Sequence, residues 1–396
     1  MGEWKKVKLG DCIKEVVEKT TKNNQHQVLS VTKDGIFSQE EFFKKQIASE
    51  NNIGYKVIRR NNIVFSTMNL WMGSLDVLTN YDIGIVSPAY KIFKFNEELM
   101  LPSYGKYFMK SYYMLEQYKN CSEQGASVVR RNLDLKALLN ISIEIPSIHE
   151  QQKIVDILKK VDQIIEIIKK EIKQHINYKN NIINNISDEH SKDVIIDEVF
   201  DKITDYVAAG SFADLKNNVQ YKSNKDYAQL IRTIDIKSKF KNTESVYISK
   251  TAFEFLWRVN LTEDNIVLPN IGANIGEVYY LKKDDLPFKN NVLGPNAILL
   301  GKSEILKYMY YYFQSSDFQK KLKLIVGASG QPKFNKTDLR KIKIKIPSSK
   351  KQKKIINVLE KNDKIISLLI QKNEKYEKLK KGLMQQLLTG KIKVRI

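Results

Sequence analysis

The chain has 396 residues, of which 42% are hydrophobic and 10% aromatic. This content is enough to fill globular cores and excludes a wholly disordered chain, and the length predicts two or three domains. Lys and Arg number 66 against 45 Asp and Glu, so the formal net charge is +21. Such an excess favours a polyanionic partner, with nucleic acid ahead of a membrane surface, although an ordinary basic surface also accounts for it.

The cysteine and histidine content indicates a reduced protein without a metal framework. Cys12 and Cys121 are the two cysteines and form no CxxC pair, and the four histidines do not fall at metal-ligand spacing. The sequence contains no run of about 18 apolar residues and no apolar segment of a secretory signal near its start. We therefore expect a cytoplasmic protein with no transmembrane helix and no bound metal.

Short apolar runs bounded by turn residues predict strands in both halves of the chain. In chain order these runs are Val28–Val31, Ile63–Phe65, Ile83–Val86, Ile92–Phe95, Ile266–Leu268, Val278–Leu281 and Ala297–Leu300. Two aromatic-rich segments, Tyr104–Tyr118 and Tyr308–Leu324, predict helices. Ile141–Ile145 and Ile342–Ile346 alternate apolar and polar residues and end at a proline, which is typical of an edge strand.

A long helix is predicted after each of these two edge strands. Ser147 and Ser348 are candidate N-caps, and apolar residues then recur at steps of three and four, without proline, over about 150–186 and 350–388. Each helix needs a helical mate, so we expect an antiparallel coiled coil. The residues expected to pack are Ile154, Leu158, Val161, Ile165 and Ile168 in the first helix and Ile355, Leu359, Asn362, Ile366 and Leu369 in the second.

Asn362 falls at a heptad a position of the second helix. A buried Asn at such a position fixes the register of a coiled coil at a cost in stability. A solvated Asn at a frayed seam accounts for the sequence equally well, so both interpretations stay open.

The two halves of the chain are copies of one unit. Leu138–Ile168 aligns with Leu339–Leu369 at a shift of 201, and 14 of the 31 pairs are identical. Upstream, Gly125-Ala-Ser127 matches Gly327-Ala-Ser329, and the Tyr, Tyr and Ser of 104–111 match those of 308–315. The ordered matches predict a duplicated unit of about 200 residues, which is too long for a solenoid repeat.

The repeat predicts an α+β fold with pseudo-twofold internal symmetry, in which two mixed α/β domains are separated by two long paired helices. The expected boundaries are 1–147 for the first domain, 148–188 for the first helix, 189–347 for the second domain and 348–396 for the second helix and C-terminal tail. The last segment is strongly basic, with 18 Lys and Arg against four acidic residues over 340–396. This charge is either the solvated face of a coiled coil or a surface that attracts phosphate or an acidic protein.

The sequence offers no recognisable catalytic motif. It has no GxxxxGK[ST] phosphate loop, no GxGxxG after a strand, no Asn/Asp-Pro-Pro-Tyr tetrapeptide and no nuclease carboxylate cluster. Gly272-Ala-Asn-Ile-Gly276 has the wrong spacing for a dinucleotide site and is interpreted as a tight turn.

The recurring Gly-Ala-Ser turn precedes the edge strand in both copies and carries polar and basic side chains. Small residues let the backbone approach a phosphate, and Arg, Asn and Gln read purines in the major groove. A solvent-facing loop that closes onto the helix is the alternative, and we expect the aromatics Trp71, Trp257, Tyr310 and Tyr312 in the core. The candidate DNA-binding residues are Arg59, Arg60, Asn69, Ser74, Ser127, Arg130, Arg131, Lys222, Arg232, Asn270, Asn274, Ser329, Gln331, Lys333, Asn335 and Lys336.

This organisation resembles the specificity subunit of type I restriction–modification enzymes. The resemblance covers the whole chain and includes the opening Trp4-Lys-Lys-Val-Lys-Leu-Gly-Asp11, the helix start His149-Glu-Gln-Gln-Lys-Ile154 and the ending Leu383-Met-Gln-Gln-Leu-Leu-Thr-Gly-Lys391. The second copy departs from the family pattern at Lys350-Lys-Gln352, where a Glu-Gln pair is usual.

The resemblance implies that each mixed domain is a target-recognition domain for one half of a bipartite double-stranded DNA sequence. The helices would set the gap between half-sites and dock two methyltransferase subunits, and a motor and nuclease subunit would join for cleavage. S-adenosylmethionine, ATP and Mg²⁺ are then expected on those partners only, and this chain has no catalytic residue and no cofactor. The two domains differ more than the helices do, so we expect different half-sites.

Two other functions fit the residues. A coiled-coil scaffold with a basic face would bind nucleic acid or an acidic protein without sequence preference. A single-chain enzyme with an unrecognised active site would turn over a substrate without partners.

Overall fold

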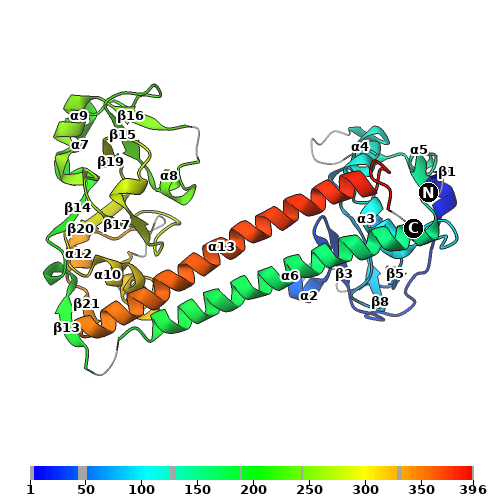
Figure 1. Cartoon of the computed structure of the whole chain (residues 1–396), viewed down its shortest axis with the longest axis horizontal. Helices are drawn as coiled ribbons and strands as arrows, with labels where there is room; N and C mark the ends of the chain where they lie inside the picture. The colour runs from blue at the N-terminus through cyan, green and yellow to red at the C-terminus, as the bar shows by residue number, and fades with distance from the viewer. Residues whose placement is uncertain are drawn as a thin grey trace. The chain divides into compact units, whose positions relative to one another are not determined.

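The computed structural model describes residues 4–42, 51–124, 131–187, 190–241, 244–327 and 332–394. The chain divides into two compact units, which are residues 1–170 with 370–396 (unit 1) and residues 171–369 (unit 2). Each unit holds one mixed domain and a stretch of each of two long helices, α6 (Ile148–Asn184) and α13 (Ser349–Leu387) (Figure 1). Among the described residues, no helix has the length and apolar character needed to cross a bilayer.

The domain of unit 1 is built on a four-stranded antiparallel sheet with the order β2-β9-β6-β7. The strands of this sheet are β2 (Ile13–Glu15), β9 (Tyr90–Phe95), β6 (Ile63–Ser66) and β7 (Leu75–Val77). Smaller strand pairs among the described residues are β3 (Leu29–Thr32) with β4 (Gly35–Ser38), β5 (Lys56–Arg59) with β8 (Ile83–Val86), and β10 (Ser122–Gln124) with β11 (Arg131–Leu133). The short helices are α1 (Leu9–Cys12), α2 (Gln39–Phe42), α3 (Pro102–Phe108), α4 (Tyr112–Asn120) and α5 (Leu135–Leu139).

The domain of unit 2 repeats this sheet in the order β14-β20-β17-β18. The strands are β14 (Lys202–Asp205), β20 (Ala297–Gly301), β17 (Asn265–Pro269) and β18 (Tyr279–Leu281). A second sheet consists of β16 (Val246–Ile248), β15 (Ala228–Ile231) and β19 (Asn291–Leu293). The domain also contains the helices α7 (Phe212–Asn218), α8 (Thr233–Lys237), α9 (Lys250–Phe255), α10 (Leu306–Tyr312), α11 (Ser316–Ile325) and α12 (Lys336–Arg340). The matching strand orders confirm the internal repeat.

The predicted strands all form, but each aromatic-rich segment is two helices rather than one. A turn separates α3 from α4 and α10 from α11. Ser111 and Ser315 end these turns as N-caps, because their side chains accept hydrogen bonds from the backbone N–H groups of Met114 and Phe318. The Ser shared by the two copies is therefore the signal for the break.

The two edge strands pair with the strand that opens each domain. β12 (Ser142–Ile145) pairs with β1 (Lys5–Lys8), and β21 (Lys343–Ile346) pairs with β13 (Lys192–Ile195). The helix that follows each edge strand is fastened to it by a buried Gln. Gln151 Nε2 donates to the carbonyl of Pro146 at 3.1 Å, and Gln352 Nε2 donates to that of Pro347 at 2.8 Å.

The aromatic helices pack on the four-stranded sheets and form the cores. Phe65 and Phe93 stack in unit 1 with ring centroids 5.3 Å apart, and Tyr104 and Phe108 are buried in the same cluster. The ends of the long helices extend these cores. Leu387, in the last turn of α13, belongs to the core of unit 1, and Ile186, which lies 201 positions earlier, belongs to that of unit 2.

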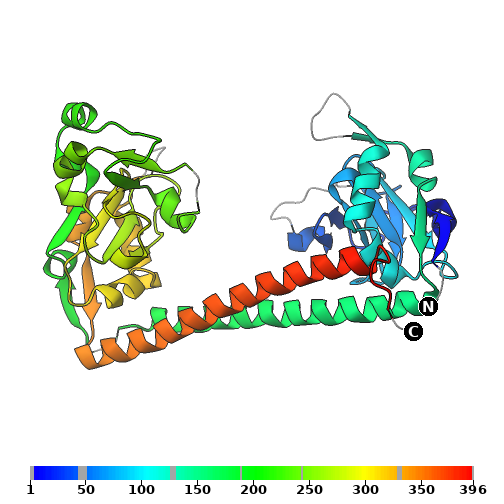
Figure 2. The ribbon, with the colours of Figure 1, turned by 45° about the horizontal axis from the view of Figure 1, so that its top comes forward.

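Within each unit the stretches of α6 and α13 lie side by side (Figure 2). In unit 1, Asp162 pairs with Lys380 and Lys169 pairs with Glu377. The residue number on α13 falls as that on α6 rises, so the two helices are antiparallel. The stripe residues of α6 named above are all buried, whereas on α13 Leu359 and Asn362 are buried and Ile355, Ile366 and Leu369 are half-buried.

Asn362 is 3% exposed in unit 2, so the buried interpretation of this residue holds. Its Oδ1 accepts a hydrogen bond from His175 Nδ1 at 2.7 Å, and its Nδ2 donates to the carbonyl of His175 at 3.1 Å. Asn362 therefore joins α13 to α6 through two hydrogen bonds to one residue, His175.

Candidate nucleic-acid interface

In unit 2, the segment that follows the recurring turn lies against the loop after β17. The backbone N–H of Phe334 donates to the carbonyl of Asn270, and Asn270 Nδ2 donates to the carbonyl of Phe334, both at 3.1 Å. Ile271 and Lys333 form a β-bridge in between. We call this the unit 2 junction.

Unit 1 has the same junction between the start of β11 and the loop after β6. The backbone N–H of Arg131 donates to the carbonyl of Met68 at 3.2 Å. The Arg131 guanidinium lies 4.6 Å from the centroid of the Trp71 ring, within the range of a cation–π contact. The backbone contact is shared by the two units, while the side chains at it are different.

Buried polar atoms without a hydrogen-bond partner among the described residues occur at both junctions. There are three in unit 1, Asn69 Oδ1, Trp71 Nε1 and Arg131 Nε, and one in unit 2, Asn270 Oδ1. Such atoms cost free energy in a folded protein, so the three at the unit 1 junction mark a place where packing is not optimised for stability alone.

A glycine holds each junction loop close to the helix beneath it. Gly73 and Gly276 have φ of +84° and +97°, a backbone conformation that residues other than glycine rarely adopt. A Cβ on Gly73 would come within 3.2 Å of Leu115, and one on Gly276 within 2.8 Å of Gln319. The segment between Gly272 and Gly276 is a turn, as expected from its sequence.

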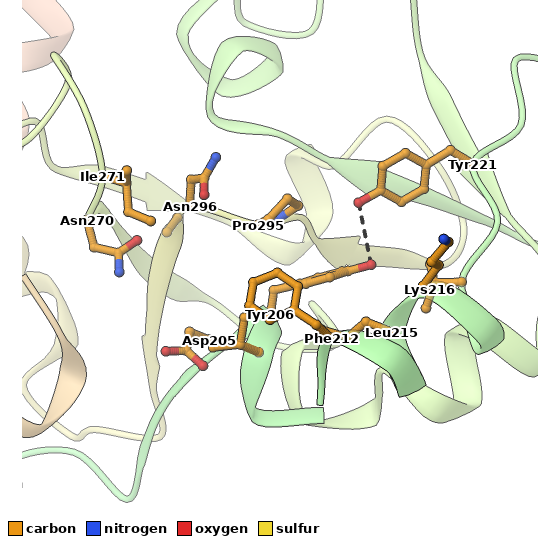
Figure 3. A pocket seen from close by; sticks show the side chains of 13 residues that line it. Asp205, Tyr206, Phe212, Leu215, Lys216, Tyr221, Asn270, Ile271, Pro295 and Asn296 are labelled. Atoms are coloured by element: carbon orange, nitrogen blue, oxygen red, sulfur yellow. Dashed lines mark hydrogen bonds between the residues drawn. The ribbon is translucent and has the colours of Figure 1, made fainter. Parts of the chain in front are cut away.

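A cavity of about 400 Å³ opens beside the unit 2 junction (Figure 3). Its walls are aromatic on one side, where Tyr221 and Tyr206 are joined by a hydrogen bond between their hydroxyls at 3.4 Å, and amidic on the other, where Asn270 and Asn296 lie. Burial raises the pKa of the Tyr206 hydroxyl, so this group is protonated. At one edge, Asp205 forms a 2.8 Å ion pair with Lys336.

Two other predicted residues of unit 1 lie apart from its junction. Arg59 and Arg60 sit at the opposite end of β6 and are paired with Glu18 at 2.8 Å and Asp82 at 2.6 Å. A third predicted residue, Ser74, lies in the junction loop, where its backbone N–H donates to the carbonyl of Asn69 at 3.3 Å and its hydroxyl donates to that of Val31 at 3.4 Å.

Four further predicted residues of unit 2 also have protein partners. Arg232 makes two 2.9 Å hydrogen bonds to Asp235, and the Lys222 ammonium lowers the pKa of Asp226, to which it is hydrogen-bonded. Asn274 Oδ1 accepts from Lys237, and Asn335 caps α12 by accepting from the N–H of Asp338. Lys333 is exposed on the junction.

The structure brings together Asn69, Ser74 and Arg131 in unit 1 and Asn270, Lys333, Asn335 and Lys336 in unit 2. Ser127, Arg130, Ser329 and Gln331 lie outside the described residues. None of the contacts above tests DNA binding, so all sixteen residues stay predictions.

Sequence reasoning did not find the aromatic side of the cavity, and it was wrong about one tryptophan. Trp257 is 61% exposed rather than part of the core, and Arg258 stacks on it at 4.6 Å. The cavity residues Tyr206 and Tyr221 are 64 and 49 positions from Asn270, and no motif links them. Tyr312 is buried as expected, and Tyr310 and Trp71 are half-buried.

In the described parts of the chain, no three His, Cys, Asp or Glu side chains are placed to hold a metal ion. Cys12 and Cys121 are free and buried, and burial raises the pKa of the Cys12 thiol to about 11.

The chain matches the family model of the type I restriction modification DNA specificity domain twice, over residues 1–178 and 190–378. The MjaVIII specificity subunit of a type I restriction enzyme from Methanocaldococcus jannaschii is 25% identical, and the match covers 99% of this chain and 94% of that protein. A second protein of that organism, described as a putative type I restriction enzyme MjaX specificity subunit, is 30% identical over 35% of this chain and 31% of its own length.

Two solved structures share the fold. A chain from work on complex assembly and conformational transition of the type I R-M system has a TM-score of 0.58 and 13% identity, covering 98% of both chains. The S subunit of a type I restriction–modification system from M. genitalium has a TM-score of 0.51 and 14% identity, covering 98% of this chain and 96% of that one. The two model matches take in most of both repeats, so the chain belongs to the type I restriction–modification DNA specificity family.

Proposed function

We propose that this chain is the DNA-reading subunit of a type I restriction–modification complex, in which each domain recognises one half of a bipartite target. The observation that carries this proposal is the pair of equivalent junctions with unlike side chains. Arg131 and Met68 occupy the places in unit 1 that Phe334 and Asn270 occupy in unit 2, and Arg131 stacks on Trp71. Base readout resides in side chains, so two such sites would read different half-sites.

The partners follow from a second repeated feature, the exposed apolar residues on the long helices. Ile167 and Leu368 lie 201 positions apart and are 57% and 56% exposed, and Tyr178 and Leu379 lie 201 apart and are 51% and 48% exposed. Ile167 and Leu379 belong to unit 1, and Leu368 and Tyr178 belong to unit 2. We call these the outer apolar pairs. An equivalent apolar pair in each unit fits two copies of one partner, the methyltransferase subunit.

The remaining chemistry is assigned to those partners. S-adenosylmethionine would bind to the methyltransferase subunits, which methylate adenine, and ATP and Mg²⁺ to a motor and nuclease subunit. The helices would set the distance between the half-sites. A DNA target and two free thiols suit work in the cytoplasm.

Methylome sequencing of the host with and without the gene tests the proposal. A bipartite adenine-methylated motif is expected to disappear with the gene. Replacing residues 1–140 with those of a relative that reads another target is expected to change one half of the motif and leave the other half as it was. A hybrid in which both halves change, or methylation that persists without the gene, would refute the assignment.

A further inference from the structure

The structure contains two equivalent groups of three side chains that no motif had indicated as a set. In unit 1 they are Tyr107 from α3, Asp162 from α6 and Lys380 from α13. Tyr107 Oη donates to Asp162 Oδ2 at 2.7 Å, and Lys380 Nζ pairs with Asp162 Oδ1 at 2.6 Å. The same ammonium lies 5.7 Å from the Tyr107 ring centroid. We call this the unit 1 triad.

Unit 2 has its own triad of Tyr311 from α10, Asp363 from α13 and Lys179 from α6. Tyr311 Oη donates to Asp363 Oδ2 at 2.9 Å, Lys179 Nζ pairs with Asp363 Oδ1 at 2.7 Å, and the ammonium lies 5.4 Å from the Tyr311 ring centroid. Every contact of the unit 1 triad is reproduced with nearly the same geometry.

The origin of the lysines is what makes these triads informative. Asp162 and Asp363 are 201 positions apart in the sequence, and so are Lys179 and Lys380. Each triad therefore combines the tyrosine and aspartate of one repeat with the lysine of the other repeat's helix. The tyrosine of each domain contacts both helices through one carboxylate, so a triad is complete only when the domain and both helices are in register.

The triads are better placed to fix an orientation than the other helix-to-helix ion pair in unit 1. The side chains of Lys380 and Lys179 are mostly covered, and burial together with the aspartate contact raises the pKa of both triad tyrosine hydroxyls. Lys169 and Glu377 pair at 2.8 Å on the exposed helix surface, and neither side chain has a hydrogen bond or ion pair to a domain residue among those the structure describes. Exposed pairs of that kind contribute little, whereas half-buried networks are sensitive to the loss of one member.

We propose that the two triads are the positioning residues that fix each recognition domain on the helix pair, and that they thereby determine which distance between half-sites is accepted. This inference rests on the proposed function, because it needs a bipartite target. It assigns no base contact to these residues. Their loss is expected to relax the spacing requirement and to leave the sequence of each half-site unchanged.

The test uses the full chain with its methyltransferase subunits and a panel of duplexes carrying the methylome-derived target. The distance between half-sites is varied by one and two base pairs on either side of the natural value. Lys380→Met and Lys179→Met are expected to reduce the preference for the natural distance by about tenfold, and Lys380→Arg to retain it. Lys169→Met is the matched control, because it removes an ion pair between the same two helices without touching a domain.

Tyr107→Phe is a smaller change that tests the same triad, in case a lysine variant does not fold. It removes the hydrogen bond to Asp162 and keeps the ring, and the same loss of spacing preference is expected. Variants that melt like wild type and keep its spacing preference would overturn the inference, as would an equal effect of Lys169→Met. Failure of the proposed function would look different, because the wild-type complex itself would then show no bipartite target.

Discussion

The indole of Trp4 lies against Gly390, and a Cβ on that glycine would come within 3.2 Å of the ring. Trp4 is the first residue that the structure describes, and Gly390 follows the end of α13, with φ at +69°. The contact joins the beginning and the end of the sequence within unit 1. In unit 2 the corresponding place, between the end of α6 and β13, is bridged by continuous chain.

Gly390→Ala is expected to lower the stability of unit 1. The left-handed backbone costs an alanine about 1–2 kcal/mol, and the Cβ presses on the Trp4 ring. For a unit of this size, the unfolding midpoint should fall by roughly 2–8 °C, as measured by calorimetry or circular dichroism.

Gly382→Ala is the control, and its effect should have the opposite sign. Gly382 lies inside α13, and a Cβ there meets no atom within 4 Å. Alanine is favoured over glycine in a helix by about 1 kcal/mol, so the midpoint should rise. A loss of stability from Gly382→Ala, or none from Gly390→Ala, would contradict this account of the contact.

The sequence predicted the elements whose signal is local. Alternation followed by proline located β12 and β21, and three-four periodicity located α6 and α13 within two residues of their ends. The repeat extended those predictions from one half of the chain to the other. The aromatic segments were harder, because the Ser111 and Ser315 caps interrupt them without a change in composition.

The candidate site was predicted less well, because it depends on contacts between distant segments. Arg131 and Trp71 are 60 positions apart, and only the fold shows that they stack. Sequence reasoning treated Arg59 and Arg60 as equivalent candidates, yet both are paired with carboxylates at the other end of β6. Charge and residue type identify possible DNA contacts, but the neighbours of each side chain decide which ones are free.

Asn362 is expected to be coupled to His175. In the repeat, their counterparts are Val161 and Tyr376, so unit 1 has no Asn–His pair at the equivalent positions. Asn362→Val should leave the His175 ring without its partner and lower the free energy of unfolding by about 1–2 kcal/mol. Adding His175→Tyr, which copies the counterpart pair, should recover most of that loss. The measurement is a double-mutant cycle in denaturant, and additive effects of the two changes would show that the residues are not coupled.

The outer apolar pairs predict a stepwise loss of partner binding. Ile167→Asp should remove the methyltransferase subunit bound to unit 1, and Leu368→Asp the one bound to unit 2. Burial of a large apolar side chain such as Ile167 or Leu368 against the partner contributes about 1.5–3 kcal/mol to the binding free energy. Native mass spectrometry of the assembled complex should show one methyltransferase subunit for each single variant and none for the double variant.

Val17→Asp is the control for that experiment. Val17 is also exposed and apolar, but it lies in the unit 1 domain and not on a long helix. It should leave both partners bound. Loss of both copies from either single helix variant would argue against two independent sites.

Lys333 provides a direct test of the unit 2 junction as a DNA contact. A lysine that neutralises one phosphate contributes about 0.9 to the slope of log K against log salt concentration, so Lys333→Ala should reduce that slope by roughly 1. Affinity should fall on matched and mismatched half-sites alike, since a phosphate contact carries no sequence information.

Lys250, on α9 and in a 3.8 Å pair with Glu254, is the matched exposed lysine away from the junction, and its replacement by Ala should leave the slope unchanged. Equal slopes for wild type and Lys333→Ala would remove this residue from the interface, and a slope change from Lys250→Ala would show that the basic charge acts across the domain rather than at the junction.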